Sequence, residues 1–222
     1  MSLRKNLLDT FLLPETFDQK VRNSSHRADF ICPQAFGRND YSDRGVGSII
    51  GTARDRFGDD ITIFEWLRSQ RFNPGRPNAL LADSCRDLAE TSGSRIIGQW
   101  EVMYDLYCAW PVWYTEHHQD LVAVWPPAEG YLATRELFLE TKHIADGRGW
   151  KTPLLVAQPE HIQRCYFLAR KIFDENPATS TDTISDEWFD PKSVQRWTRG
   201  KWHWLFYELC LARPHHLLKG WM

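Results

Sequence analysis

The fold is decided by residues 121–175, in which apolar runs alternate with helical patterns: LVAVWPPAEGYLATRELFLETKHIADGRGWKTPLLVAQPEHIQRCYFLARKIFDE. Leu121–Trp125 and Leu154–Ala157 are short apolar runs, typical of strands that are covered on both faces. The segment between them has apolar residues at helical spacing, and Pro159 begins a second helix. Strands that alternate with helices of this length pair in parallel. The stretch therefore predicts an α/β fold with a Rossmann-like, open, mainly parallel sheet flanked by helices.

This topology also predicts where a ligand binds. In open α/β sheets, ligands lie beyond the carboxyl ends of the strands. Two turns of the stretch face that edge, Trp125–Glu129 and Gln158–Arg164. The second turn contains His161 and Arg164, which are three positions apart near a helix start and so project from one face.

Free backbone N–H groups and the macrodipole at such a helix start favour an anion. Arg164 can bind a carboxylate or phosphate through two parallel hydrogen bonds, and His161 can donate or accept a proton. The alternative is an ordinary helix start with Arg164 in a salt bridge.

Size and composition indicate a globular protein with one domain. The chain has 222 residues, 42% of them hydrophobic and 25% charged, which suffices for a full core. We divide it into an N-terminal helical extension at 1–27, the Rossmann-like domain at 28–175, and a linker with a C-terminal helix at 176–222. Both helical additions are expected to pack on the same domain.

Charge and cysteine usage exclude several classes of protein. The net charge of −2 argues against a nucleic-acid-binding protein that works through a basic surface. Five scattered cysteines without a C-x-x-C pair favour reduced thiols in the cytoplasm over disulfides or zinc. No uncharged run approaches the ~18 residues of a membrane span, and the N-terminus lacks the features of a signal peptide.

The rest of the chain supplies further strands and helices. Residues 28–32 and 94–98 are predicted strands, and 101–109 is a predicted helix. We expect a second helix over 79–90 with Asn78 as its cap, and a long helix over 194–213.

Other segments are predicted to be irregular. Residues 33–48 are expected to form a long loop over the strand ends, and 49–57 a strand or an extended segment. We predict an aromatic loop at 110–120 and a polar linker without β-structure at 176–186.

The order of motifs resembles the YdcF/SanA/ElyC-like family. The likeness lies in ADFIC (28–32), SRIIGQWE (94–101), EGYLATRE (129–136), LLVAQPEHIQRC (154–165) and the C-terminal WLFYELCLARPHHLLKGWM (204–222). The resemblance implies a bacterial Rossmann-like protein with no settled reaction. It marks as site residues Glu101, Thr134, Glu136, His161 and Arg164. The chain departs from the family at its first turn, which reads PQAFGR where the family has glycines.

Other polar residues are candidates for ligand contacts. Glu101 and Glu136 each lie at a helix start, where a carboxylate can cap the helix, bind a ribose hydroxyl or hold a cation. Gln99 and Gln158 end predicted strands and can offer amide contacts, or remain solvated. Arg38 lies in the long first loop, and loops over strand ends often carry function.

Several common catalytic signatures are missing from the sequence. There is no G-x-S-x-G, H-E-x-x-H, Walker A or G-x-G-x-x-G motif. The pairs His117-His118 and His215-His216 lack further ligands at zinc spacing, so we predict no metal site. Cys32, at a strand end, is more typical of a small buried residue than of a nucleophile.

The sequence contains eleven tryptophans, an unusually high number. Trp197, Trp202 and Trp204 alternate with basic residues, a mixture that can stack on single-stranded nucleic acid. They also suit a helix that packs its indoles on the sheet domain, and the acidic net charge favours packing.

The leading hypothesis is a small-molecule-binding protein for an anionic or nucleotide-like ligand, such as S-adenosylmethionine, at the strand ends. If it catalyses a reaction, His161 is the predicted general acid or base, because its unperturbed pKa of about 6.5 is close to working pH. The alternative is a non-catalytic interaction protein that uses the aromatic loop Trp110–Tyr114 and the Trp-rich C-terminus. The sequence does not indicate the oligomeric state.

Overall fold

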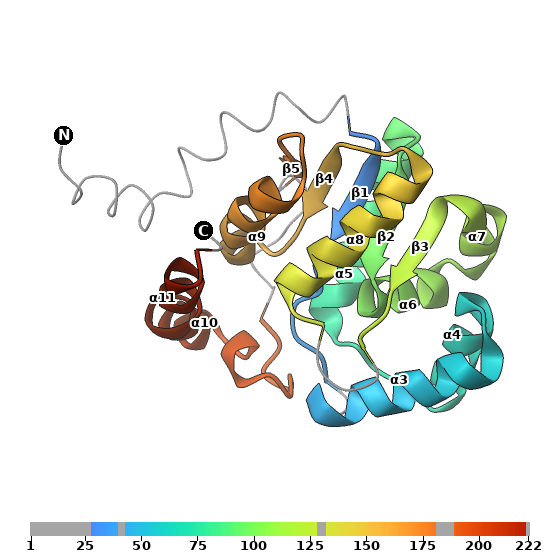
Figure 1. Cartoon of the computed structure of the whole chain (residues 1–222). Coiled ribbons are helices and arrows are strands. Elements are labelled where there is room, and N and C mark those ends of the chain that lie inside the picture. Colours follow the sequence, from blue (N-terminus) through green and yellow to red (C-terminus); the bar gives the residue numbers. More distant parts are fainter. Residues whose placement is uncertain (1–27, 40–42, 128–131, 181–188, 221–222) are drawn as a thin grey trace.

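The computed structural model describes residues 28–39, 43–127, 132–180 and 189–220, and the N-terminal extension predicted at 1–27 lies outside them. The described chain forms an α/β fold around a five-stranded sheet in which every pairing is parallel (Figure 1). The strands, in the sheet order β3-β2-β1-β4-β5, are Leu121–Val124, Arg95–Gln99, Phe30–Pro33, Pro153–Val156 and Ala178–Ser180. This confirms the predicted Rossmann-like open sheet.

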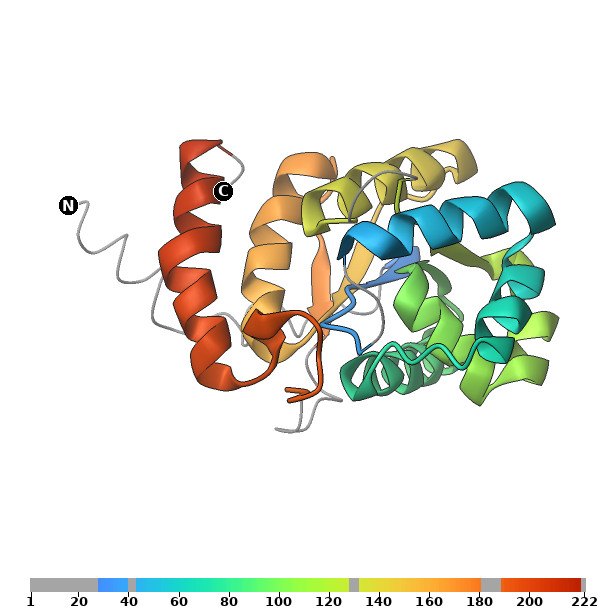
Figure 2. The same ribbon diagram turned by 90° about the horizontal axis from the view of Figure 1, so that it is seen from below.

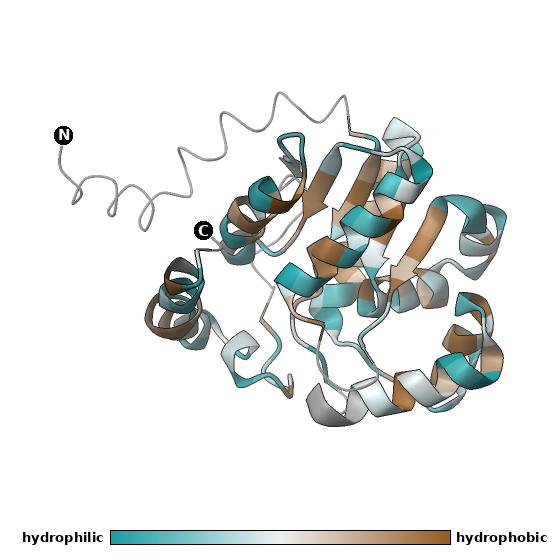
Figure 3. Cartoon of the chain, in the orientation of Figure 1, coloured by the Kyte–Doolittle hydropathy of each residue, from teal (hydrophilic) through white to brown (hydrophobic). Residues whose placement is uncertain are grey.

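Helices cover both faces of the sheet because successive strand residues point to opposite sides. On one face, Ile31 belongs to a core shared with α5 (Arg76–Ser92) and α6 (Trp100–Ala109). On the other face, Phe30 and Cys32 pack against α8 (Thr134–Arg148) and α9 (Pro159–Ile172). Figure 3 shows the apolar strands enclosed between these two layers.

The strand order reverses between β1 and β4. From β1 the chain moves outward through β2 to β3, and it then returns through α8 to place β4 on the other side of β1. Cys32 pairs with Leu155 across this junction. The carboxyl ends of strands at such a switch point diverge and leave a crevice, which is the expected ligand position.

Strand β5 corrects the prediction of a linker without β-structure at 176–186. Thr179 and Ser180 extend the sheet beside Leu155 and Val156 of β4. Their polar side chains and the strand's length of three residues gave no apolar run that a sequence pattern could detect.

The segment after β1 is also more helical than predicted. Residues 43–57, assigned to a loop and then to an extended segment, form α3 (Asp43–Phe57), with Ile50 and Ala53 buried on its inner face. Helix α4 (Asp60–Ser69) follows, and the Asp59 side chain accepts a hydrogen bond from the Thr62 amide at 2.9 Å. Three glycines in α3 lowered its helical signal, but burial of its apolar face compensates.

Two further local predictions were wrong. Asn78 does not cap α5. Its side chain instead accepts from the Phe36 amide at 2.9 Å and donates to the Gly37 and Pro74 carbonyls, both at 2.8 Å. The predicted aromatic loop at 110–120 forms α7 (Pro111–Glu116) and the 3-10 turn η2 (His118–Asp120).

The C-terminal helix begins later than predicted, at Lys201 rather than at 194. The chain passes through the 3-10 turn η3 (Arg196–Thr198) into α10 (Lys201–Tyr207), the π-helical turn η4 (Glu208–Ala212) and α11 (Arg213–Leu218). Figures 1 and 2 both show this continuous helix beside α9. No helix in the described residues is long and apolar enough to cross a membrane.

Candidate functional site

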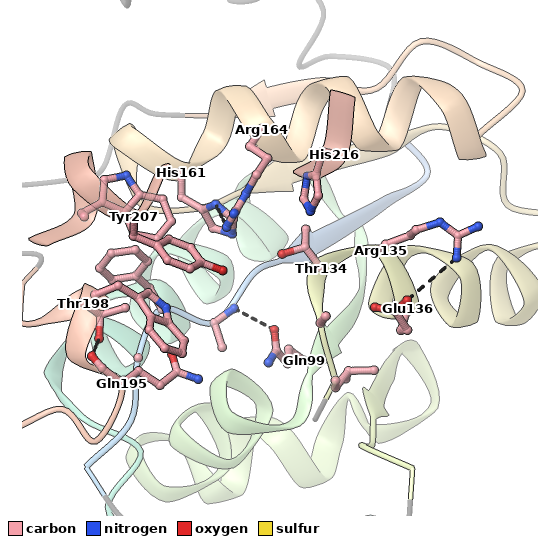
Figure 4. A pocket seen from close by; sticks show the side chains of 17 residues that line it. Gln99, Thr134, Arg135, Glu136, His161, Arg164, Gln195, Thr198, Tyr207 and His216 are labelled. Atoms are coloured by element: carbon pink, nitrogen blue, oxygen red, sulfur yellow. Dashed lines mark hydrogen bonds and ion pairs between the residues drawn. The ribbon is translucent and has the colours of Figure 1, made fainter. Parts of the chain in front are cut away.

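A cavity of about 100 Å³ lies at the carboxyl ends of β1, β2 and β4, beside the switch point. Three parts of the chain line it: the loop that follows β1, the starts of helices α6, α8 and α9, and the C-terminal segment. The lining residues are Ala35, Phe36, Gly37, Gln99, Leu132, Ala133, Thr134, Arg135, Glu136, His161, Arg164, Gln195, Trp197, Thr198, Trp204, Tyr207 and His216 (Figure 4).

The cavity is surrounded by the N-termini of three long helices. The N-cap residues of α6, α8 and α9 are Gln99, Ala133 and Gln158, and none of the three makes a side-chain capping bond. The first turn of each helix therefore keeps backbone N–H groups that the N-cap side chain does not satisfy. Because the positive ends of three helix dipoles converge there, the cavity favours a negatively charged group.

The C-terminal segment closes the cavity and is tied to the loop after β1. The Arg38 carbonyl accepts hydrogen bonds from the Val194 amide at 2.7 Å and from the Ser193 hydroxyl at 3.0 Å. Asn39 donates to Asp190 at 2.9 Å. These bonds join residues more than 150 positions apart and make the C-terminal segment one wall of the site.

The packing behind this wall leaves no room for a larger residue at Gly37. A Cβ atom there would lie 2.6 Å from Thr198 Oγ1 and 2.9 Å from Ser193 Oγ. The backbone of Gly37 also has a φ of +74°, a conformation that favours glycine. This residue therefore permits the close approach of the two segments.

His161 and Arg164 are in direct contact, as their spacing on α9 predicted. Arg164 Nη2 lies 3.1 Å from His161 Nδ1. An arginine can only donate hydrogen bonds, so Nδ1 accepts and the proton of the neutral ring is on Nε2. Among the described residues, none makes a hydrogen bond with Nε2. His161 thus presents a ring N–H donor that is available to a ligand.

The surroundings of His161 keep it neutral. Its ring is 4% exposed and lies edge-on to Trp204, with 5.3 Å between ring centroids. Burial, together with the Arg164 guanidinium and His216, lowers the pKa of His161 well below its usual value. The pKa of His216 is lowered to about 4, mainly by burial and then by Arg164. At neutral pH both rings are therefore uncharged.

Arg164 is held in place by the C-terminal helix. Its Nη1 lies 3.3 Å from Glu208 Oε2, and its guanidinium carbon lies 5.2 Å from the centre of the Trp204 ring. Arg213 Nε donates to Glu208 Oε1 at 3.0 Å, so one carboxylate lies between two arginines. All three charged side chains are buried. Glu208 begins the π-helical turn, a distortion that often occurs at functional sites.

One donor of Arg164 remains unused. Its Nε atom is buried and has no hydrogen-bond partner in the described part of the chain. A buried donor without a partner costs about 1–3 kcal/mol, which a bound acceptor would recover.

The structure brings together five of the eight residues predicted to form the site. Gln99, Thr134, Glu136, His161 and Arg164 all line the cavity (Figure 4). The side-chain oxygen of Gln99 accepts a hydrogen bond from the Ala35 amide at 3.2 Å. Its NH2 group takes no part in this bond.

The other three predicted residues do not line it. Gln158 is fully buried at the N-cap of α9. Glu101 and Arg38 are buried together, with Glu101 Oε1 3.6 Å from Arg38 Nη1. Glu101, which was expected to face a ligand, is therefore in the interior beside an arginine, and its ligand contact stays a prediction.

The sequence did not indicate the contribution of the C-terminal segment. Trp204 is buried against Phe36 and His161, and Trp197 stacks on Tyr207 with 4.9 Å between centroids. The stack of Trp197 lies within the C-terminal segment, whereas the contacts of Trp204 agree with the prediction that the indoles pack on the domain. Trp202 does not, since it is 82% exposed.

Among the described residues, the cysteines and the possible metal ligands form no second candidate site. Burial raises the pKa of the Cys32 thiol to about 12, so this residue is a poor nucleophile. All five cysteines are free thiols. No group of three or more His, Cys, Asp or Glu side chains is close enough to hold a metal ion within the described ranges.

Comparisons with protein-family models, with curated proteins and with solved structures find no match to the chain. The resemblance to the YdcF/SanA/ElyC-like family stays a prediction.

Proposed function

We propose that the chain binds a small molecule through an anionic group, at the switch point between β1 and β4. The observation that carries this proposal is the convergence of the α6, α8 and α9 N-termini on one cavity that Arg164 and His161 also line. Helix N-termini, an arginine donor and a neutral histidine N–H all stabilise negative charge. The hydroxyl of Thr134 and the amide of Gln99 add neutral donors.

The volume of the cavity limits the group that it admits. A cavity of 150 Å³ can bind benzene, and typical ligand pockets measure 300–1,000 Å³. At about 100 Å³, this cavity fits a phosphate or a carboxylate but not a whole nucleotide or S-adenosylmethionine. For such a ligand, only the anionic group would occupy this space.

The role proposed for His161 is binding rather than proton abstraction. Its Nδ1 is engaged by Arg164, and its Nε2 already carries a proton. In this state the ring donates a hydrogen bond, and it has no free nitrogen lone pair with which to take a proton from a ligand.

Calorimetric titration with inorganic phosphate and with acetate tests the proposal. The wild-type chain is expected to bind at least one of the two, and Thr134→Val, which keeps the shape of the side chain, should weaken binding several-fold. His161→Phe removes the ring donor and should weaken it about tenfold or more, whereas His143→Phe, on the exposed face of α8, should not. The proposal fails if neither anion binds, or if all three variants bind like wild type.

A second candidate function, binding to another protein molecule such as a second copy of the chain, is favoured by the outer face of the C-terminal helix. Large apolar side chains are exposed there, and they include Trp202, Phe206, Leu209 and Leu211. The predicted aromatic loop offers less, because Tyr114 is buried and Trp113 stacks on His117. Sedimentation at rising concentration tests this candidate: Trp202→Ser should abolish any self-association of the wild-type chain.

A further inference from the structure

A second and larger cavity adjoins the first. It has a volume of about 470 Å³ and lies between α3, the end of β3 and α8. Leu132 and Glu136 line both cavities, so the two meet at the start of α8. This second space falls within the 300–1,000 Å³ range of ligand pockets, whereas the first does not.

One wall of the second cavity is aromatic and firmly positioned. Trp125 Nε1 donates to Asp60 Oδ1 at 2.8 Å. Its ring stacks on Trp100, with 5.8 Å between centroids and 19° between planes. Pro126 and Ile144 extend the apolar surface. A flat, fixed indole bordered by apolar side chains suits a planar ring.

Two carboxylates of α8 also line the second cavity. Glu136 and Glu140 lie one turn apart on α8, so both face the same cavity. Their carboxylates accept hydrogen bonds from hydroxyl or amino groups. Arg54, from α3, supplies a donor. The second cavity therefore carries charges of both signs, as does the first, which Arg135 and Glu136 line, but only the first is bordered by three helix N-termini.

We propose that the two cavities form one site for a ligand in two parts, which rests on the anion binding proposed above. The anionic group occupies the first cavity, and a planar ring with hydroxyl or amino substituents occupies the second. Glu136, which lines both, contacts the portion that joins them. A nucleoside monophosphate has this chemistry: a phosphate, a hydroxyl-bearing sugar and a planar base.

Titration with phosphate, with the four ribonucleoside monophosphates and with the matching nucleosides tests this inference. At least one monophosphate should bind tenfold or more tightly than phosphate, and tighter than its own nucleoside. Ile144→Trp places an indole in the space proposed for the planar ring and should reduce the affinity for that monophosphate to that for phosphate, without changing phosphate binding. The matched variant His143→Trp places the same bulk on the exposed side of α8 and should bind like wild type.

A second variant tests the inference even if Ile144→Trp does not fold. Glu140 is exposed, so Glu140→Gln leaves the fold intact and should weaken monophosphate binding several-fold while phosphate binding is unchanged. If phosphate binds but no monophosphate binds more tightly, the two-part site is wrong and the anion site stands. If neither phosphate nor any monophosphate binds, both fail.

Discussion

Arg164 Nη2 lies 3.1 Å from His161 Nδ1, and this contact determines which nitrogen of the ring carries the proton. The contact in turn depends on Glu208, whose carboxylate holds the same guanidinium from the C-terminal helix at 3.3 Å. A residue from the end of the chain thus orients a side chain at the start of α9. The candidate site is therefore complete only when the C-terminal helix is docked.

The first prediction concerns the protonation of His161. Nitrogen-detected NMR should show a neutral ring with its proton on Nε2 at pH 7. Because burial lowers its pKa, the ring should remain neutral below pH 6, where an exposed histidine is already charged. A ring protonated on Nδ1, or a pKa of 6.5 or above, would contradict the assignment.

A dependence of stability on pH follows from the same shift. Above about pH 6.5, His161 is neutral in both the folded and the unfolded state, so it does not make the free energy of unfolding depend on pH. Below that pH the unfolded state binds a proton that the folded state does not, and the free energy of unfolding falls by about 1.4 kcal/mol per pH unit. His216, with a pKa of about 4, should steepen the fall between pH 6.5 and 4.

Urea denaturation across this range measures the effect. His161→Gln should flatten the slope below pH 6.5, whereas His143→Gln, at an exposed position, should leave it unchanged. Equal slopes in the wild type and in both variants would show that His161 titrates normally.

Glu208 provides the second prediction. Glu208→Gln removes the carboxylate that lies between two buried arginines, and breaking a buried pair typically costs about 3–5 kcal/mol. The control is Glu90→Gln, because Glu90 pairs with Arg86 on the surface of α5 and exposed pairs contribute about 1 kcal/mol or less. Equal losses of unfolding free energy in the two variants would argue against a structural role of the buried network.

The fold was largely predictable because its signals are local. Four strands could be predicted from apolar runs. The end of α8 is marked by Gly149, where φ is +74°, and the start of α9 is marked by Pro159. Strand β5 was not predictable in this way, since its three residues form no apolar run and pair with β4 only through tertiary packing after α9.

The site was predictable only in part, for a related reason. His161 and Arg164 share one helix turn, so their contact could be read from their spacing. Glu208 lies 44 positions after Arg164, and Trp204 reaches His161 across a similar separation. Contacts of this kind depend on tertiary packing, for which spacing along the chain gives no signal. The burial of Glu101 against Arg38 was missed for the same reason.

The third prediction tests the docking of the C-terminal segment. Gly37→Ala forces a Cβ atom to within 2.6 Å of Thr198 Oγ1, so it should loosen the segment from Ser193 onward. Gly149→Ala is the matched control, because its φ is also +74° but nothing lies within 4 Å of its Cβ position. Both variants carry backbone strain of about 1–2 kcal/mol, and only Gly37→Ala adds a steric clash.

Hydrogen exchange distinguishes these two glycine variants. Amides from Val194 to Trp204 should exchange faster in Gly37→Ala and at the wild-type rate in Gly149→Ala. Equal exchange in both would mean that the contact between Gly37 and Thr198 does not hold the segment.

The fourth prediction concerns the cysteines. Cys210 is exposed and should react with a thiol reagent within seconds to minutes in the folded protein, and half-buried Cys108 more slowly. Cys32, Cys85 and Cys165 are buried with raised pKa values and should react only on unfolding. Rapid modification of all five thiols without denaturant would contradict the packing of the sheet.

The central claim, that an anion binds where three helix N-termini meet, is tested most directly by phosphate titration of the 15N-labelled chain. The account predicts that the largest amide shifts occur at Trp100–Glu101, Thr134–Glu136 and His161, at the starts of α6, α8 and α9, and that they saturate together. Shifts that map elsewhere, or that increase linearly without saturation, would contradict a specific anion site at the switch point.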